Sequence, residues 1–130
     1  MIKLVVRGNS LKGILDDGDE VEVEDVFSAS VGDLIIFETV SKPLVIKILM
    51  GVPGNKINLH DNILSINEYK IELNNIQIIV WDDWAREKTI PEGYVVVMGT
   101  NKHSFDSKQF GFLPIDDIIG RVVNINRVNS

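Results

Sequence analysis

Short apolar runs separated by turn residues extend along most of this chain. Residues 20–24 alternate strictly between glutamate and valine, which is the period of a half-buried β-strand. Residues 2–6, 34–37 and 43–50 are rich in branched aliphatic side chains and stand close to Gly, Asp or Pro. Runs of this composition between turn residues predict strands.

The same pattern continues through the second half of the chain. The segment 56–73 contains three short apolar runs joined by polar turns, which predicts a small meander. Further strands are expected at 76–81, 94–98 and 118–128, and helical turns only at 82–86 and 114–119. Many short strands at turn spacing predict an all-β fold. A length of 130 residues predicts one domain, residues 1–130, with the β extension at about 56–81.

The amino-acid composition argues against several classes of function. The chain carries 13 basic and 19 acidic residues, a formal net charge of -6, and has no basic run, so a nucleic-acid partner is not expected. It has no cysteine, which excludes disulfides and thiolate metal sites. The only histidines, His60 and His103, stand in turn-like contexts, so neither a metal nor another cofactor is expected. No apolar run approaches about 18 residues, the length of a membrane-spanning helix.

Ser10 and Lys47 are the candidate catalytic pair. Ser10 follows a predicted strand and is flanked by Gly8 and Gly13, which suit a backbone that must leave the strand and expose a hydroxyl. A serine needs an adjacent base to act as a nucleophile. Lys47 lies in the most apolar stretch of the chain, and apolar surroundings lower the pKa of a lysine toward the range of a general base. Alternatively, Ser10 is a turn serine and the Lys47 ammonium reaches water at a sheet edge.

The polar segment 99–111 is the third element of this candidate site. Its composition is also that of an ordinary surface loop. A lysine base needs acceptors for its own protons, and Ser104 or Ser107 is a candidate for that contact. Asp106 and Lys108 are expected to pair and to hold the segment in place.

Taken in order, these motifs resemble those of the type I signal peptidases. The family's serine motif, G-x-S-M-x-P-T-L followed by G-D, is matched by residues 8–15 and 18–19. Its lysine motif, with a basic residue in an apolar strand before G-x-P-G-D, is matched by residues 46–55. Its last motif, G-D-N-x-x-x-S-x-D-S-R-x-x-G, is similar to residues 99–111. The resemblance covers nearly the whole chain, and its specificity lies in the order and spacing of the motifs.

This resemblance implies a fold of bent antiparallel sheets, or a partial barrel, with a small β extension. It also implies a serine endopeptidase that cleaves signal peptides from secretory precursors after a small, Ala-like residue, without a cofactor. Ser10 would be the nucleophile, Lys47 the general base and Ser104 the residue that orients the lysine. The other implied roles are support by Asp106 and Lys108, and substrate pockets lined by Val6, Leu11, Leu15 and Ile46.

The family also implies a location. Its members work at a membrane surface on the extracytoplasmic side, held by a helix just before the serine motif, whereas only nine residues precede Ser10 here. An extracytoplasmic location is therefore expected if an anchor precedes this sequence.

The motifs depart from the family at several positions. Leu11 replaces Met, Gly13-Ile14 replaces Pro-Thr, Thr100 replaces Asp, and Lys108 replaces Arg, which removes bidentate pairing with Asp106. The late motif is also similar to that of processing peptidases from conjugation and pilus systems. Two alternatives remain: a self-cleaving repressor-type serine-lysine peptidase, and a non-catalytic peptidase-like binding or assembly module.

Overall fold

The computed structural model describes residues 2–25, 29–40 and 44–128. Its strands are β1 (Ile2–Val5), β2 (Glu20–Glu24), β3 (Leu34–Phe37), β4 (Val45–Gly51), β5 (Ile57–His60), β6 (Ile63–Ile66), β7 (Tyr69–Glu72), β8 (Tyr94–Met98), β9 (Leu113–Pro114) and β10 (Ile118–Asn126). The helical elements are α1 (Asn75–Trp84), η1 (Ala85–Glu87), α2 (Ser107–Phe110) and η2 (Ile115–Asp117). Among the described residues, no helix is long and apolar enough to cross a membrane.

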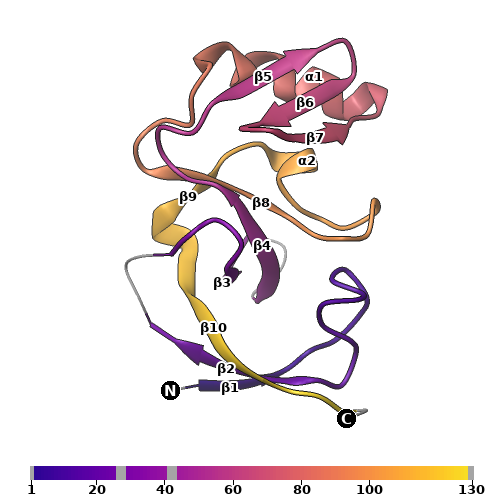
Figure 1. Cartoon of the computed structure of the whole chain (residues 1–130), viewed down its shortest axis with the longest axis vertical. Helices are drawn as coiled ribbons and strands as arrows, with labels where there is room; N and C mark the ends of the chain where they lie inside the picture. The colour runs from indigo at the N-terminus through magenta and orange to yellow at the C-terminus, as the bar shows by residue number, and fades with distance from the viewer. Residues whose placement is uncertain (1, 26–28, 41–43, 129–130) are drawn as a thin grey trace.

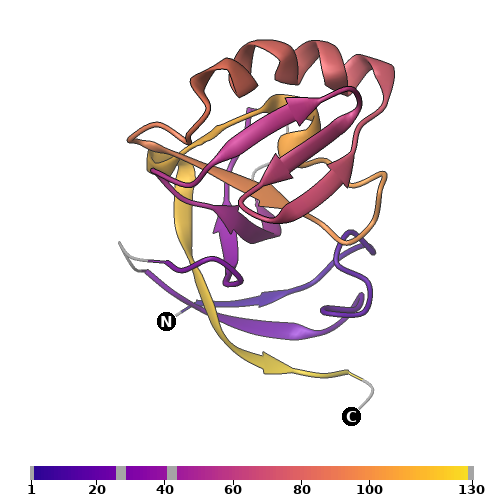
Figure 2. The same ribbon diagram turned by 45° about the horizontal axis from the view of Figure 1, so that its top comes forward.

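Two antiparallel sheets make up the fold. The larger has the strand order β1-β2-β10-β3-β4-β8-β9, and the smaller has the order β5-β6-β7. Figures 1 and 2 show β1, β2 and the end of β10 curling away from the small sheet, with β4 and β8 between them. Irregular register at Leu49/Gly51, Ile118/Gly120 and Val122/Asn124 accompanies this bending, as bulges increase the local twist. The expected all-β fold of bent antiparallel sheets is confirmed.

Most of the predicted strands are present within one or two residues of their expected bounds. The alternating segment 20–24 forms β2, with Val21 and Val23 buried and the glutamates on the other face. The strand expected at 43–50 appears as β4, while Pro43 lies outside the described residues. The helical turns expected at 82–86 and 114–119 correspond to the end of α1 with η1 and to η2.

The strand expected at 76–81 is wrong, because this segment lies inside helix α1. Asn74 caps the helix by accepting from the Gln77 N–H at 2.9 Å, and the Gln77 side chain accepts from the Asn74 N–H at 3.0 Å. This reciprocal capping box satisfies two backbone donors that would otherwise be unpaired at the helix start. The Trp81 side chain anchors the helix to the core: it packs against Phe112 and is completely buried. The β extension therefore consists of β5–β7 with a helix beside it (Figure 2).

Asp19 connects the two ends of the chain. Its carboxylate accepts from the N–H groups of Asp16 at 2.8 Å and Val128 at 2.9 Å, and lies 3.3 Å from an Arg127 nitrogen. The two backbone N–H groups, aided by Arg127 and opposed by burial, hold the pKa of Asp19 below its ordinary value. Arg127 also donates to the carbonyl of Ile14, so the end of the chain supports the loop that follows Ser10.

We predict that Asp19→Asn destabilises the fold at neutral pH and that the effect shrinks in acid. A carboxyl group whose pKa is lower in the folded state contributes stability above its unfolded pKa, about 3.9, and loses it as the pH falls through the folded value. Urea midpoints of the wild type and variant at pH 7, 5 and 3 measure this convergence. The exposed Glu92→Gln is the matched control, and a constant difference across the three pH values contradicts the prediction.

Candidate active site

Ser10 and Lys47 are in direct contact, although 37 residues separate them in the chain. The Lys47 Nζ donates to the Ser10 Oγ at 2.9 Å and lies 3.3 Å from the carbonyl oxygen of Ile46. Lys47 is in the middle of β4, and its side chain is almost completely buried. The amino group of Lys47 is therefore held inside the fold against a serine hydroxyl.

The loop carrying Ser10 is held from two sides. The Val6 N–H donates to Asp19 and the Val6 carbonyl accepts from Gly18, which extends the β1–β2 ladder by one residue. Gly8 then turns the chain with a φ of 90°, a left-handed conformation that a side chain would disfavour. On the other side, the Ser10 carbonyl accepts from the N–H groups of Thr100 at 2.9 Å and Asn101 at 3.3 Å. In the described part of the chain, the N–H of Ser10 donates to no acceptor.

Asp106 organises the late polar segment. This carboxylate is completely buried and accepts from the Gly99 N–H at 2.8 Å, the Lys108 N–H at 2.9 Å, the Lys108 Nζ at 2.6 Å and the Ser104 hydroxyl. Asp106 also caps helix α2, with Gln109 completing the capping box. A buried charge is tolerated when it is paired and fully hydrogen-bonded, and this one meets both conditions. The expected Asp106–Lys108 pair is thus present.

The two candidate serines of this segment have different surroundings. Ser104 lines the same groove as Ser10 and Lys47, and its hydroxyl is bound to Asp106. The Ser107 hydroxyl instead accepts from the N–H of Val97 in β8, and its carbonyl accepts from the Trp81 indole N–H at 2.8 Å. Ser107 therefore attaches the segment to β8 and α1, and Ser104 is the serine on the groove side.

The groove around Ser10 has a volume of about 610 Å³. Its walls are the segments 4–11 and 44–47, and Asn101 with residues 103–105 closes it. Three of the residues expected in substrate pockets, Val6, Leu11 and Ile46, line this groove. Leu15 does not line it: the side chain is fully buried in the cluster that also contains Leu11 and Val21.

The sequence analysis assigned no individual role to several residues of the groove. Asn101 and Phe105, from the predicted segment 99–111, line it, and Arg7, which was not considered, stands at its wall. Gly99 belongs to the same segment but was given no role, although a Cβ at this position would lie 2.6 Å from the Ser10 carbonyl and 2.6 Å from the Ser104 Oγ. The signal was available in part, since a glycine directly after a buried strand indicates a close backbone approach.

Two strand edges facing this groove have backbone groups that pair with no other strand among the described residues. The backbone N–H and C=O groups of Val6 are hydrogen-bonded to Asp19 and Gly18, just before β2. Because backbone groups alternate in direction along a strand, those of Val5 and Arg7 point the other way, to the open edge of β1. In β4, the backbone groups of Leu49 are hydrogen-bonded to Gly32 and Asp33, just before β3. Because the direction alternates with each residue, the backbone N–H and C=O of Ile46 point away from β3. The pairing of β4 with β8 begins only at Ile48, which leaves Ile46 at an open edge. The groove thus has room for one extended peptide between two strands.

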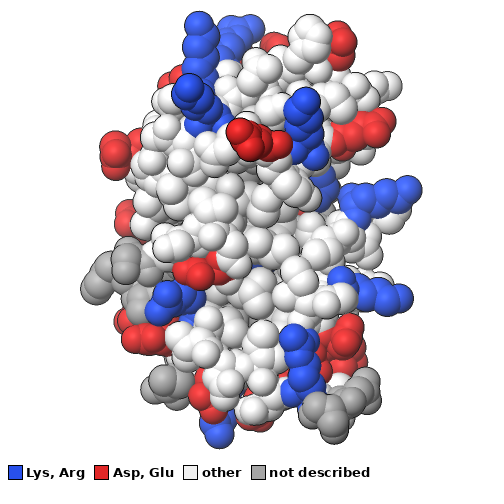
Figure 3. Space-filling view, in the orientation of Figure 1, with Lys and Arg blue, Asp and Glu red and all other residues white. Residues whose placement is uncertain are grey.

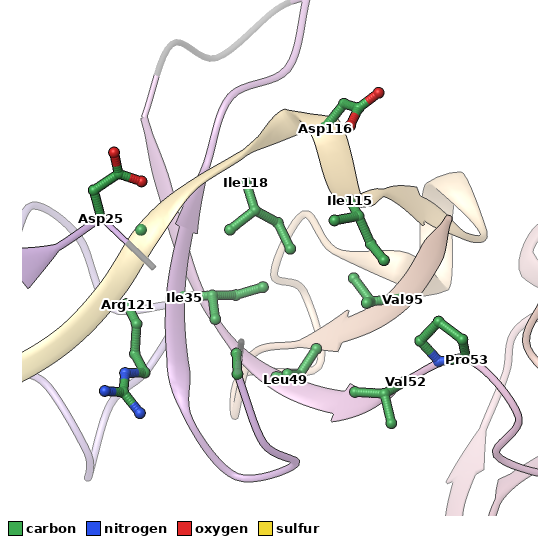
Figure 4. Close-up of a pocket in the computed structure, with 12 residues that line it drawn as sticks. Asp25, Ile35, Leu49, Val52, Pro53, Val95, Ile115, Asp116, Ile118 and Arg121 are labelled. Atoms are coloured by element: carbon green, nitrogen blue, oxygen red, sulfur yellow. The ribbon is translucent and has the colours of Figure 1, made fainter. Parts of the chain in front are cut away.

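A second hollow, of about 340 Å³, lies elsewhere in the fold. Figure 4 shows aliphatic side chains from β3, β4, β8 and the start of β10 pointing into it, with Asp25, Asp116 and Arg121 at its margin. None of the candidate catalytic residues lines it. In the described residues, no group of three or more histidine or acidic side chains is placed to hold a metal ion.

The family model described as signal peptidase, peptidase S26, matches residues 1–126. The chain belongs to the signal peptidase family. It is 29% identical to a signal peptidase I of Bacillus caldolyticus, over 91% of this chain and 75% of that protein. It is 30% identical to thylakoidal processing peptidase 1 of Arabidopsis thaliana, over 91% of this chain but only 39% of that protein. As a member of the family, the protein is a serine endopeptidase.

The solved structures agree with this assignment at the level of the fold. A signal peptidase I from Enterococcus faecalis superposes with a TM-score of 0.51 and 23% sequence identity, covering 75% of this chain and 97% of that one. The expected resemblance to type I signal peptidases is therefore confirmed, and it extends through all the motifs that surround the groove.

We predict that Lys108→Met strongly destabilises this signal peptidase. The substitution keeps an unbranched apolar stem but leaves the Asp106 carboxylate buried without its cation, which costs about 3–5 kcal/mol when a buried ion pair is broken. Chemical denaturation measures the loss in free energy of unfolding. Lys108→Arg, which keeps the charge, is expected to retain most of it, and equal stability of Lys108→Met and wild type would contradict the prediction.

We also predict that Gly99→Ala lowers peptidase turnover by at least about tenfold, a barrier increase of roughly 1.4 kcal/mol. The added Cβ forces apart the Ser10 carbonyl and Ser104, and a shift of about 1 Å in a catalytic group has effects of this size or larger. The control is Gly13→Ala in the Ser10 loop, whose Cβ would meet no atom within 4 Å, although its φ of 94°, unlike the backbone of Gly99, disfavours a side chain. If both variants lose activity equally, the contact at Gly99 is not the cause.

Proposed function

We propose that this protein removes signal peptides from secretory precursors by a serine-lysine mechanism, with Ser10 as nucleophile and Lys47 as general base. The observation that carries this proposal is the 2.9 Å contact between the Lys47 Nζ and the Ser10 Oγ in a site where the lysine is buried. Burial disfavours the ammonium form, and the Nζ contacts the neutral oxygens of the Ser10 hydroxyl and the Ile46 carbonyl. A neutral amine at this distance can accept the serine proton.

The reaction would proceed through an acyl-enzyme. The Ser10 Oγ attacks the scissile carbonyl carbon as its proton passes to Lys47. The tetrahedral intermediate collapses when the C–N bond breaks, and the new amino terminus of the mature protein leaves with the proton from Lys47. The signal peptide remains as an ester on Ser10. Lys47 then takes a proton from water as the water oxygen attacks the ester carbonyl carbon. The acyl C–O bond to Ser10 breaks, the peptide leaves as a carboxylic acid, and Lys47 returns the proton to the Ser10 Oγ.

The Ser10 N–H is suited to stabilise the developing oxyanion. It has no acceptor among the described residues and belongs to the residue whose hydroxyl attacks. Its position is set by the bonds from Thr100 and Asn101 to the Ser10 carbonyl. Donors held in place before reaction stabilise a transition state without the cost of reorganisation.

Ser104, Asp106 and Lys108 are proposed as positioning residues. Asp106 orients the Ser104 hydroxyl and the Gly99 N–H, and the adjacent Thr100 binds the Ser10 loop. This chain of contacts fixes the segment that faces Lys47 across the groove. Ser104 is proposed to orient Lys47 during the reaction.

The substrate would bind as an extended strand between the open edges at Arg7 and Ile46, through main-chain hydrogen bonds. Val6, Leu11 and Ile46 offer small apolar pockets for the side chains one and three residues before the cut. Shallow apolar pockets favour alanine-sized residues and exclude larger ones by shape.

A membrane surface on the extracytoplasmic side is the proposed place of action. Val5 and Leu44 are each about half exposed, and both line the groove. Exposed apolar side chains gathered at one place mark sites of contact with a membrane or a partner.

We predict that the wild type cleaves a precursor with an Ala-x-Ala site, whereas Ser10→Ala and Lys47→Ala reduce turnover by about a thousandfold or more, because the two groups act as one unit. Cleavage in detergent, followed by mass spectrometry of the products, measures this. The same mass spectra should also detect the acyl-enzyme, in which the signal peptide is esterified to Ser10.

The control substitution for this assay is Lys70→Gln, an exposed lysine on β7 remote from the groove. Full activity of the Lys47→Ala variant would exclude Lys47 as the base. Cleavage of the protein's own chain in preference to the precursor would favour the self-cleaving alternative.

A further inference from the structure

Arg7 stands on the outer side of the substrate groove. Along β1 and its extension, Leu4 and Val6 point into the core cluster, while Val5 and Arg7 are exposed on the opposite face. The Arg7 side chain therefore lies on the same face as Val5, next to the open backbone edge at which a substrate strand would bind.

The lining of the groove has a charge unlike that of the whole protein. The chain has a net charge of -6, and the face in Figure 3 shows acidic and basic side chains intermixed around a broad uncharged centre. The residues lining the groove include Arg7, Lys47 and His103 but no aspartate or glutamate. The nearby Asp17 carboxylate accepts from the Gly8 N–H at 2.8 Å. Within the described residues, Arg7 forms no ion pair.

An extended substrate directs alternate side chains to opposite faces. If the residues one and three before the cut enter the apolar pockets at Val6, Leu11 and Ile46, the residue between them must point outward. Strands paired edge to edge place neighbouring side chains on the same face, so this middle side chain lies beside Arg7.

We propose that Arg7 determines specificity for an acidic side chain at the middle position, two residues before the cut. The preferred substrate class is thus a precursor with a small-acidic-small sequence at its cleavage site. This inference rests on the proposed function, since it assumes that the groove binds a peptide in the cleavable register.

The test uses peptides that are identical except for Glu, Gln or Lys at the middle position, and a matched set with the same changes at the first residue after the cut. An exposed ion pair contributes about two- to fivefold, and a like-charge contact costs a similar factor. We therefore expect the wild type to prefer Glu over Lys at the middle position by about tenfold in kcat/KM, and the preference to fade at high salt.

Arg7→Gln should bring this ratio close to one, and Arg7→Glu should invert it in favour of Lys, while Lys70→Gln leaves it unchanged. A ratio that Arg7→Gln does not alter overturns the inference. A dependence on Arg7 that appears only after the cut overturns it as well.

Binding to the Ser10→Ala protein separates this inference from the proposed function. Fluorescence anisotropy with the same labelled peptides measures the Glu-to-Lys affinity ratio without any cleavage. If the wild type cleaves none of the peptides but the affinity ratio still depends on Arg7, the proposed catalysis fails and the assignment of Arg7 stands. Equal affinities for the Glu and Lys peptides in the presence of Arg7 overturn the assignment.

Discussion

The buried carboxylate of Asp106 is the interaction on which the geometry of the site depends. A charge without solvent must be fully hydrogen-bonded, so Asp106 draws Gly99, Ser104 and Lys108 around itself. Gly99 and Thr100 then meet the backbone of Ser10, which lies some ninety positions earlier in the chain. One electrostatic requirement thereby links the end of β8 to the loop that carries Ser10. Lys108 balances the charge of Asp106 through a single short contact of 2.6 Å.

The opposite side of the Ser10 loop is held by a second buried carboxylate, that of Asp19. Asp19, Arg127 and Val128 connect this loop to the end of β10. Between the two supports, Ser10 leaves the sheet at Gly8 and meets Lys47 from β4. Lys47 is held in place by the sheet itself, because it lies within β4, which pairs with β3. Ser10 is thus positioned by contacts that hold its loop from both sides, and Lys47 by its place in a β-strand.

The open edges of the sheet give the groove its proposed specificity. In the part of the chain that the structure describes, the outward backbone groups at Val5, Arg7 and Ile46 have no strand partner, and free edges of this kind are the usual places for a peptide to add as a strand. The groove lining includes the apolar side chains of Val6, Leu11 and Ile46, and the guanidinium of Arg7 forms no ion pair with any residue that the structure describes. Main-chain pairing, side-chain size and charge would thus be sensed on three sides of one extended substrate.

Local pattern in the sequence determined the strands, the turns and the identity of the Ser10–Lys47 candidates, because alternation and turn residues act over a few positions. The helix at 75–84 was mistaken for a strand, since a short apolar run has no decisive period, although Asn74 and Gln77 carried the capping signal. Only the tertiary structure decided that Ser10 and Lys47 touch, that Ser104 binds Asp106, and that Leu15 is buried beneath the groove. These depend on contacts between segments far apart in the chain, which local pattern does not encode.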